Sequence, residues 1–245
     1  MASTWKAGIL FGILVVSINV WAGPVAPALK VPADKTIRVL FVIDRETDVM
    51  DVAGPWEVFD TVMVTSDGKP TDDPNSATFP FKQFIVADTK APIRLDGGMS
   101  VTPDYTFDDA PPANLVVIPA QVTGSEAKLA WIRKMAKSSD VTFSVCMGAH
   151  VLADAGLLEH QDATTHHLAY PFFVKKYPSV KWRSGVRYVE GDRVSTAAGV
   201  ISGVDLALHI VERYFGRDVA QRTAEQMEYH GDFWKNPDML SAQSH

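Results

Sequence analysis

Short runs rich in β-branched residues alternate along this chain with segments whose apolar residues recur at helical spacing. The expected strands cover 36–44, 81–88, 114–120 and 141–146, and the expected helices cover 55–65, 124–139, 148–158, 201–216 and 217–229. Shorter elements are expected at 99–113, 162–167, 168–178 and 180–199, with a loop at 66–79. Strands that alternate with helices predict a parallel sheet covered on both faces. The pattern therefore predicts an α/β fold with a mostly parallel central sheet.

The ends of three expected strands indicate where a functional site would lie. In open parallel sheets, ligands bind in the crevice beyond the carboxyl ends of the strands. Three strands end close to Asp44, Pro119 and Cys146. We therefore expect the connections that follow these residues to meet at one edge of the sheet.

Composition narrows the range of partners. The chain has 245 residues, of which 47% are hydrophobic, and this is enough for one domain with a sizeable core. The net charge is −6 and no cluster of lysine and arginine forms a phosphate-binding stripe, so we expect no nucleic-acid partner. One cysteine cannot form an internal disulfide or a thiolate zinc cage. Metal-ligand spacings and glycine-rich phosphate motifs are also absent from the sequence, so no metal and no cofactor is expected.

The first 22 residues predict a secretory signal peptide. Lys6 precedes an uncharged apolar run at 7–20, and Val20 and Ala22 suit the −3 and −1 positions of a cleavage site. The run is shorter than the roughly 20 residues of a membrane span. We expect export to the periplasm or the medium, with no stable membrane insertion after cleavage. The alternative is an uncleaved N-terminal anchor. The remaining organisation is a linker at 23–35, a domain at 36–230 and a C-terminal tail at 231–245.

Cys146 ends a buried strand, and the chain then turns towards a helix. This is the arrangement of a nucleophile elbow, in which Gly148 suits the tight turn. A thiol at a helix N-terminus is expected to have a lowered pKa. The backbone N–H of Met147 is a candidate donor to a developing oxyanion. The alternative is that Cys146 is an inert, buried small hydrophobe.

Acids and histidines elsewhere are candidate partners of the thiol. Asp51 follows the first strand and is either a proton donor or a helix cap. Glu57, in the next helix, is either a pocket residue or an exposed glutamate. His166 follows a short strand and is either functional or structural, while His150 lies one helical turn after Cys146 and is either a pocket or a core histidine.

Four segments together resemble the ThiJ/PfpI superfamily, which has the class I glutamine amidotransferase-like fold. They are "DVAGPWEVF", "SVCMGAHVLADAGLL", "ATTHHLAYPFFVKKYPSVKW" and "VSTAAGVISGVDLALHIVERYFGRDVAQ". The resemblance covers residues 36–229, and within the superfamily the chain looks most like the isonitrile hydratase branch. It also resembles the N-terminal domains of AraC-type regulators.

The resemblance implies a flavodoxin-like three-layer sandwich with Cys146 at its elbow. It implies that Asp51 stands where many relatives carry a glutamate beside the cysteine, and that His166 matches a family histidine. Relatives often pair, so it also implies a homodimer. Two positions depart from the family pattern. Met147 replaces a common threonine, and Ala120-Gln121 replaces a Gly-Gly pair. Backbone N–H donors survive both changes, but the pocket around them is altered.

Three hypotheses of function follow. The first is an exported isonitrile hydratase-like lyase, in which Cys146 adds to a small electrophilic substrate and Asp51 supplies the proton. The second is a glyoxalase or deglycase that uses Cys146 and His166 on reactive carbonyls. The third is a non-enzymatic redox sensor, ligand-binding module or chaperone.

Overall fold

The computed structural model describes residues 26–121, 124–236 and 238. Its main sheet has seven strands in the order β10-β11-β7-β6-β1-β2-β5. Neighbouring strands are parallel except for β10 and β11, which are antiparallel. The strands are β1 (Ile37–Val42), β2 (Phe81–Ala87), β5 (Tyr105–Thr106), β6 (Leu115–Ile118), β7 (Val141–Val145), β10 (Tyr188–Val189) and β11 (Val194–Ala197). The prediction of a mostly parallel sheet is confirmed.

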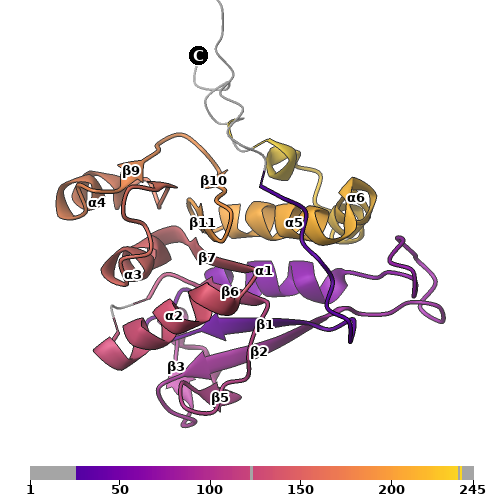
Figure 1. Cartoon of the computed structure of the whole chain (residues 1–245), viewed down its shortest axis with the longest axis horizontal. Coiled ribbons are helices and arrows are strands. Elements are labelled where there is room, and N and C mark those ends of the chain that lie inside the picture. Colours follow the sequence, from indigo (N-terminus) through magenta and orange to yellow (C-terminus); the bar gives the residue numbers. More distant parts are fainter. Residues whose placement is uncertain (1–25, 122–123, 237, 239–245) are drawn as a thin grey trace, which may run out of the picture.

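Helices cover both faces of this sheet (Figure 1). One face carries α1 (Val49–Thr61), α5 (Ser202–Phe215) and α6 (Arg217–Gln226), and the other carries α2 (Glu126–Ser138), α3 (Ala149–Asp154) and the short α4 (Tyr170–Lys176). The smaller elements are β3 (Ile93–Arg94) paired with β4 (Ser100–Val101), β8 (Asp162–Ala163) paired with β9 (Lys181–Trp182), and the 3₁₀ turns η1 (Asp96–Gly98), η2 (Cys146–Gly148) and η3 (Phe233–Lys235). The three-layer sandwich is thus confirmed.

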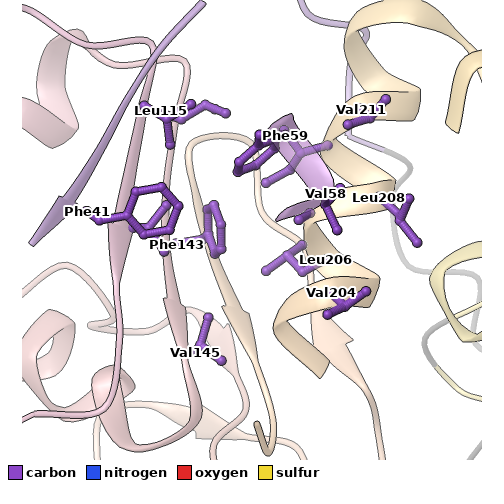
Figure 2. Packing of buried hydrophobic residues seen from close by; sticks show 14 of the residues in the cluster. Phe41, Val58, Phe59, Leu115, Phe143, Val145, Val204, Leu206, Leu208 and Val211 are labelled. Atoms are coloured by element: carbon purple, nitrogen blue, oxygen red, sulfur yellow. The ribbon is translucent and has the colours of Figure 1, made fainter. Parts of the chain in front are cut away.

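The core forms on both faces because the central strands are apolar at successive positions. Neighbouring residues of a strand point to opposite sides. Phe41 and Phe143 therefore face α1 and α5, as Figure 2 shows, while Leu40 and Val116 pack on the side of α2 and α3. Each such buried side chain stabilises the fold by about 1.5–3 kcal/mol. The sheet is therefore a rigid base for the residues at its carboxyl edge.

Helix α1 begins at Val49, six residues before the start that the sequence predicted. The reason is a cap at Asp48, whose side chain accepts a hydrogen bond from the Met50 N–H at 2.9 Å. Pro55 consequently lies inside the helix. The earlier start places Asp51 in the first helical turn instead of in the preceding connection.

The folded body extends beyond 36–230 at both ends. Within the segment predicted as a linker, the Leu29 N–H donates to the Arg213 carbonyl at 2.8 Å, and Arg213 Nε donates to the Pro27 carbonyl at 3.1 Å. Within the predicted tail, Trp234 is fully buried, and its carbonyl accepts a 2.7 Å hydrogen bond from the Tyr188 hydroxyl.

No helix in the described ranges is long and apolar enough to cross a membrane. The predicted signal peptide, 1–22, lies outside the described residues.

Candidate active site

Cys146 lies where β7 ends and the chain turns through η2 into α3. Its φ of 58° is in the left-handed region, which non-glycine residues rarely adopt. The turn also presses Gly148 against the end of β6, where a Cβ would lie 2.1 Å from the Ile118 carbonyl oxygen. Glycine is therefore required at that position. The strand, strained residue and helix together have the geometry of a nucleophile elbow.

Burial and, to a smaller extent, the carboxylate of Asp51 raise the pKa of the Cys146 thiol to about 12. Hydrogen bonds from the backbone N–H groups of Met147 and Val200 act in the opposite direction but do not offset these effects. The expectation of a lowered thiol pKa was therefore wrong. Its physical basis is weak here because α3 has only six residues, while the sulfur is largely removed from water. At neutral pH the free thiol keeps its proton.

Asp51 is completely buried beside this elbow. Its Oδ2 accepts a 2.9 Å hydrogen bond from the Ala120 N–H, while its Oδ1 has no hydrogen-bond partner among the described residues. Burial raises the pKa of Asp51 to about 7, the Ala120 bond lowers it in part, and the nearby charge of Asp48 raises it. The capping role belongs to Asp48, so the helix-cap alternative does not account for Asp51. At neutral pH this carboxyl group is poised between its acid and its ionised form.

The segment that carries His166 is attached to the elbow by a hydrogen bond. Thr165 Oγ1 donates to the Cys146 carbonyl at 3.0 Å. The Leu168 N–H donates to His166 Nδ1 at 3.3 Å, so the proton of the neutral ring lies on Nε2. Burial and the neighbouring His167 lower the pKa of His166. The imidazole is therefore neutral at pH 7, and the residue before it, Thr165, is bonded to the cysteine turn.

His150 and Met147 contact each other at the elbow. His150 Nδ1 lies 2.7 Å from the Met147 carbonyl oxygen, and burial lowers the pKa of this histidine. The Met147 side chain is 46% exposed. Glu57 is exposed on α1, whereas Asp51 on the same helix is buried. The structure does not bring Glu57 to the site, because the two carboxylates lie on different faces of the helix.

The position of the Ala120-Gln121 pair in the sequence suggested backbone N–H donors for the substrate pocket, but the structure gives the pair a different role. The Ala120 N–H is engaged by Asp51, so it is not a free oxyanion donor. Gln121 Nε2 donates to the Val42 carbonyl at 2.7 Å and to the Pro119 carbonyl at 3.2 Å. The pair therefore holds Asp51 in place and closes the end of β1. The backbone N–H groups that remain near the sulfur are those of Met147 and Val200.

A cavity of about 450 Å³ adjoins the elbow. Its lining includes Thr165 and Val200, and these residues also contact Cys146 through its carbonyl and its sulfur. Val200 follows β11, which runs parallel to β7 and ends at the same edge of the sheet. Sequence reasoning missed Thr165 and Val200. Applying the rule for strand ends to the strand within 180–199 would have found Val200.

No group of three or more His, Cys, Asp or Glu residues in the described part of the chain could hold a metal ion.

Comparisons with known proteins agree with this geometry. The sequence profile of the DJ-1/PfpI family matches residues 37–213. The chain belongs to this family. It is 27% identical over 199 residues to the isonitrile hydratase of Pseudomonas putida, covering 79% of this chain and 78% of that protein. It is also 27% identical over 153 residues to the HTH-type transcriptional regulator CdhR of Pseudomonas aeruginosa, covering 60% of this chain and 44% of the regulator.

Solved structures show the same fold. A ThiJ/PfpI family protein from Pseudomonas syringae superposes with a TM-score of 0.67 at 21% identity, covering 84% of this chain and 90% of that one. Drosophila melanogaster DJ-1beta superposes with a TM-score of 0.65 at 14% identity, covering 80% of this chain and 100% of that one. The family therefore includes at least one enzyme as well as proteins named as transcriptional regulators.

Proposed function

We propose that this member of the DJ-1/PfpI family is a cysteine-dependent hydratase that converts small isonitriles to N-substituted formamides. One observation carries the proposal: a completely buried Asp51, whose Oδ1 has no partner among the described residues and whose pKa is about 7, acts on the same thiol that sits at the elbow. A buried acid near its own pKa is suited to deliver and recover a proton. The similarity to an isonitrile hydratase along most of both chains supports this choice of substrate.

The first step joins the Cys146 sulfur to the terminal carbon of the isonitrile. The protonated Asp51 carboxyl gives its proton to that carbon, and the thiol proton passes to the carboxylate that remains. This removes the need for a free thiolate, whose formation burial opposes. The product is a thioimidate, R–N=CH–S–Cys146, and Asp51 is again protonated.

Water completes the reaction. It adds to the thioimidate carbon, and the carbon–sulfur bond breaks. One water proton goes to the nitrogen and the other returns to the sulfur, which releases R–NH–CHO and the free thiol. The N–H groups of Met147 and Val200, which point at the sulfur, stabilise negative charge there during both steps.

The test is formation of N-benzylformamide from benzyl isocyanide, measured by chromatography. Cys146→Ser is expected to lower kcat by at least about a thousandfold, since removal of a nucleophile commonly costs this much or more. Glu57→Gln is the control, because it removes an exposed carboxylate from the helix that carries Asp51. Absence of turnover by the wild type, or turnover that survives Cys146→Ser, contradicts the proposal.

A second candidate is an enzyme of reactive carbonyls that uses Cys146 with His166. Its support is that His166 is neutral and lines the cavity beside Thr165. It predicts lactate from methylglyoxal without glutathione, and loss of this activity in His166→Gln. A redox sensor is less well supported, because rapid oxidation needs an accessible thiolate and burial raises the Cys146 pKa.

We also propose that the protein is exported and acts as a homodimer. The support for export is the sequence of 1–22, and the support for pairing is the resemblance to relatives. Mass spectrometry of the protein from its native host is expected to find Gly23 as the first residue. An intact Met1 would contradict cleavage. Sedimentation is expected to give twice the mass of the chain.

A further inference from the structure

Two hydroxyl groups in the wall of the cavity beside the elbow are already engaged. Thr164 Oγ1 donates to the Arg183 carbonyl at 2.8 Å, and Thr165 Oγ1 donates to the Cys146 carbonyl at 3.0 Å. These hydroxyl groups therefore have no further proton to offer a ligand. The same wall contains the apolar side chains of Val186, Ala198, Val200 and Ile201, together with the polar side chains of His166, His167, Tyr170, Ser184 and Ser202. Apolar atoms nevertheless make up most of the exposed surface of the cavity.

Among the described residues that line the cavity, Arg187 is the one permanently charged side chain, and Asp205 neutralises it. Arg187 Nε donates to Asp205 Oδ2 at 2.6 Å, and Nη2 donates to the same oxygen. The other oxygen of Asp205 accepts from the Tyr229 hydroxyl at 2.5 Å. The guanidinium also lies over the Phe233 ring, 5.1 Å from its centroid. Asp205 is completely buried, so its charge acts on Arg187 and is little screened by water.

The geometry points to a binding site for the uncharged, apolar substituent of the substrate, kept selective for neutral groups by the Arg187–Asp205 pair. This inference rests on the proposed function, because it assigns the N-substituent of an isonitrile to the cavity whose lining residues Thr165 and Val200 also contact Cys146. The volume of about 450 Å³ suits such a group. The exposed Ile201, at 45%, adds an apolar edge to the same lining. A carboxylate entering the cavity would lose its hydration without gaining an uncompensated cation.

A matched pair of substrates tests this selectivity. Ethyl isocyanoacetate and isocyanoacetate share the reacting group and differ in charge. The wild type is expected to have a kcat/KM at least about tenfold higher for the ester. Asp205→Asn keeps the shape of the side chain but leaves Arg187 uncompensated, and is expected to reduce this preference by about tenfold or more. Equal rates in the wild type, or a preference for the anion, would overturn the inference.

A double variant separates charge from loss of structure. Arg187→Gln with Asp205→Asn removes both charges together, so the cavity stays neutral and the preference for the ester is expected to persist. If the double variant instead prefers the anion or loses discrimination, charge neutrality at this position is not what sets the preference, and the inference is overturned. Thermal unfolding of all three proteins identifies a variant that fails to fold.

Binding without turnover distinguishes this inference from the proposed function. Calorimetry with Cys146→Ser uses the two formamide products, N-formylglycine ethyl ester and N-formylglycine. The ester is expected to bind at least about tenfold more tightly, and Val186→Trp, which fills the cavity, is expected to abolish the difference. Selective binding with no turnover by the wild type would retain the neutral site and reject the hydratase. Turnover by the wild type without selective binding would retain the hydratase and reject the neutral site.

Discussion

Two buried groups of ionisable side chains in this fold are built on opposite principles. At the elbow, Asp51 has no cation beside it, and its Oδ1 is unpartnered in the described part of the chain. On α5, His209 lies between two carboxylates, with Nε2 at 2.9 Å from Glu190 and Nδ1 at 3.3 Å from Glu212, and Arg213 lies 3.2 Å from Glu190. The second group, which we call the His209 cluster, balances its charges internally.

The difference indicates which buried acid is available for chemistry. An ionised side chain that is paired with opposite charges stabilises one conformation, and its proton exchange at neutral pH is unfavourable because it would break the pairing. A buried carboxyl group without a counter-charge is held near neutrality by desolvation, so proton exchange costs little at pH 7. Helix α5 belongs to both regions, because its first residue, Ser202, lines the cavity and its middle carries His209.

The largest effect is expected from Asp51→Asn, which should lower kcat by about 10²–10⁴-fold through loss of the proton donor. In the wild type, activity is expected to fall as pH rises through about 7, because the donor form of Asp51 disappears. The remaining activity of the variant should lack this decline. A pH–rate profile measures both, with Glu57→Gln as the matched control. A decline that persists in Asp51→Asn would assign it to another group.

The same variant has a stability signature. The folded pKa of Asp51, about 7, lies above its value of 3.8 in a free side chain, so the folded state holds the extra proton between these values. The free energy of unfolding is therefore expected to fall as pH rises from about 4 to 7. The expected decrease is about 4 kcal/mol, since each unit of pKa difference corresponds to about 1.36 kcal/mol. Asp51→Asn should lose less stability across this window in chemical denaturation. Parallel curves for the two proteins would contradict the desolvated state of Asp51.

A smaller effect is expected from His209→Gln, and it should fall on stability alone. Burial by itself would lower the His209 pKa, but Glu190 and Glu212 outweigh it, and the pKa is raised. The charged form therefore stabilises the fold fully below about pH 6.5, and this contribution is lost as pH rises through the higher folded value. We expect a loss of about 1–3 kcal/mol at pH 6 and less at pH 9, with kcat unchanged. A large loss of kcat in this variant would contradict the view that the His209 cluster has a purely structural role.

The smallest effect is expected from Thr165→Val. Removing its hydrogen bond to the Cys146 carbonyl relaxes the strained turn and should lower kcat about three- to tenfold, with KM almost unchanged. Thr165→Ser keeps the hydroxyl and should restore kcat. Steady-state kinetics on the two variants separates positioning of the sulfur from a purely structural role, since a structural role would not be rescued selectively in kcat.

The sequence predicted the layers of the fold because buried parallel strands are continuous apolar runs, and these are visible without long-range information. It also predicted the turn at Cys146 and Gly148, since both lie within one short segment. It did not predict the thiol pKa, because burial depends on residues from distant segments such as Asp51 and Val200. The engagement of the Ala120 N–H by Asp51 was hidden for the same reason, since the two residues are 69 positions apart.

The buried position of Trp234 has a practical consequence for anyone who alters the end of this chain. The family match stops at 213, yet Trp234 is fully buried and Phe233 stacks on the guanidinium of Arg187. A protein truncated at residue 213 would lose the buried Trp234 side chain from its core and the contact of Phe233 with Arg187 at the cavity wall.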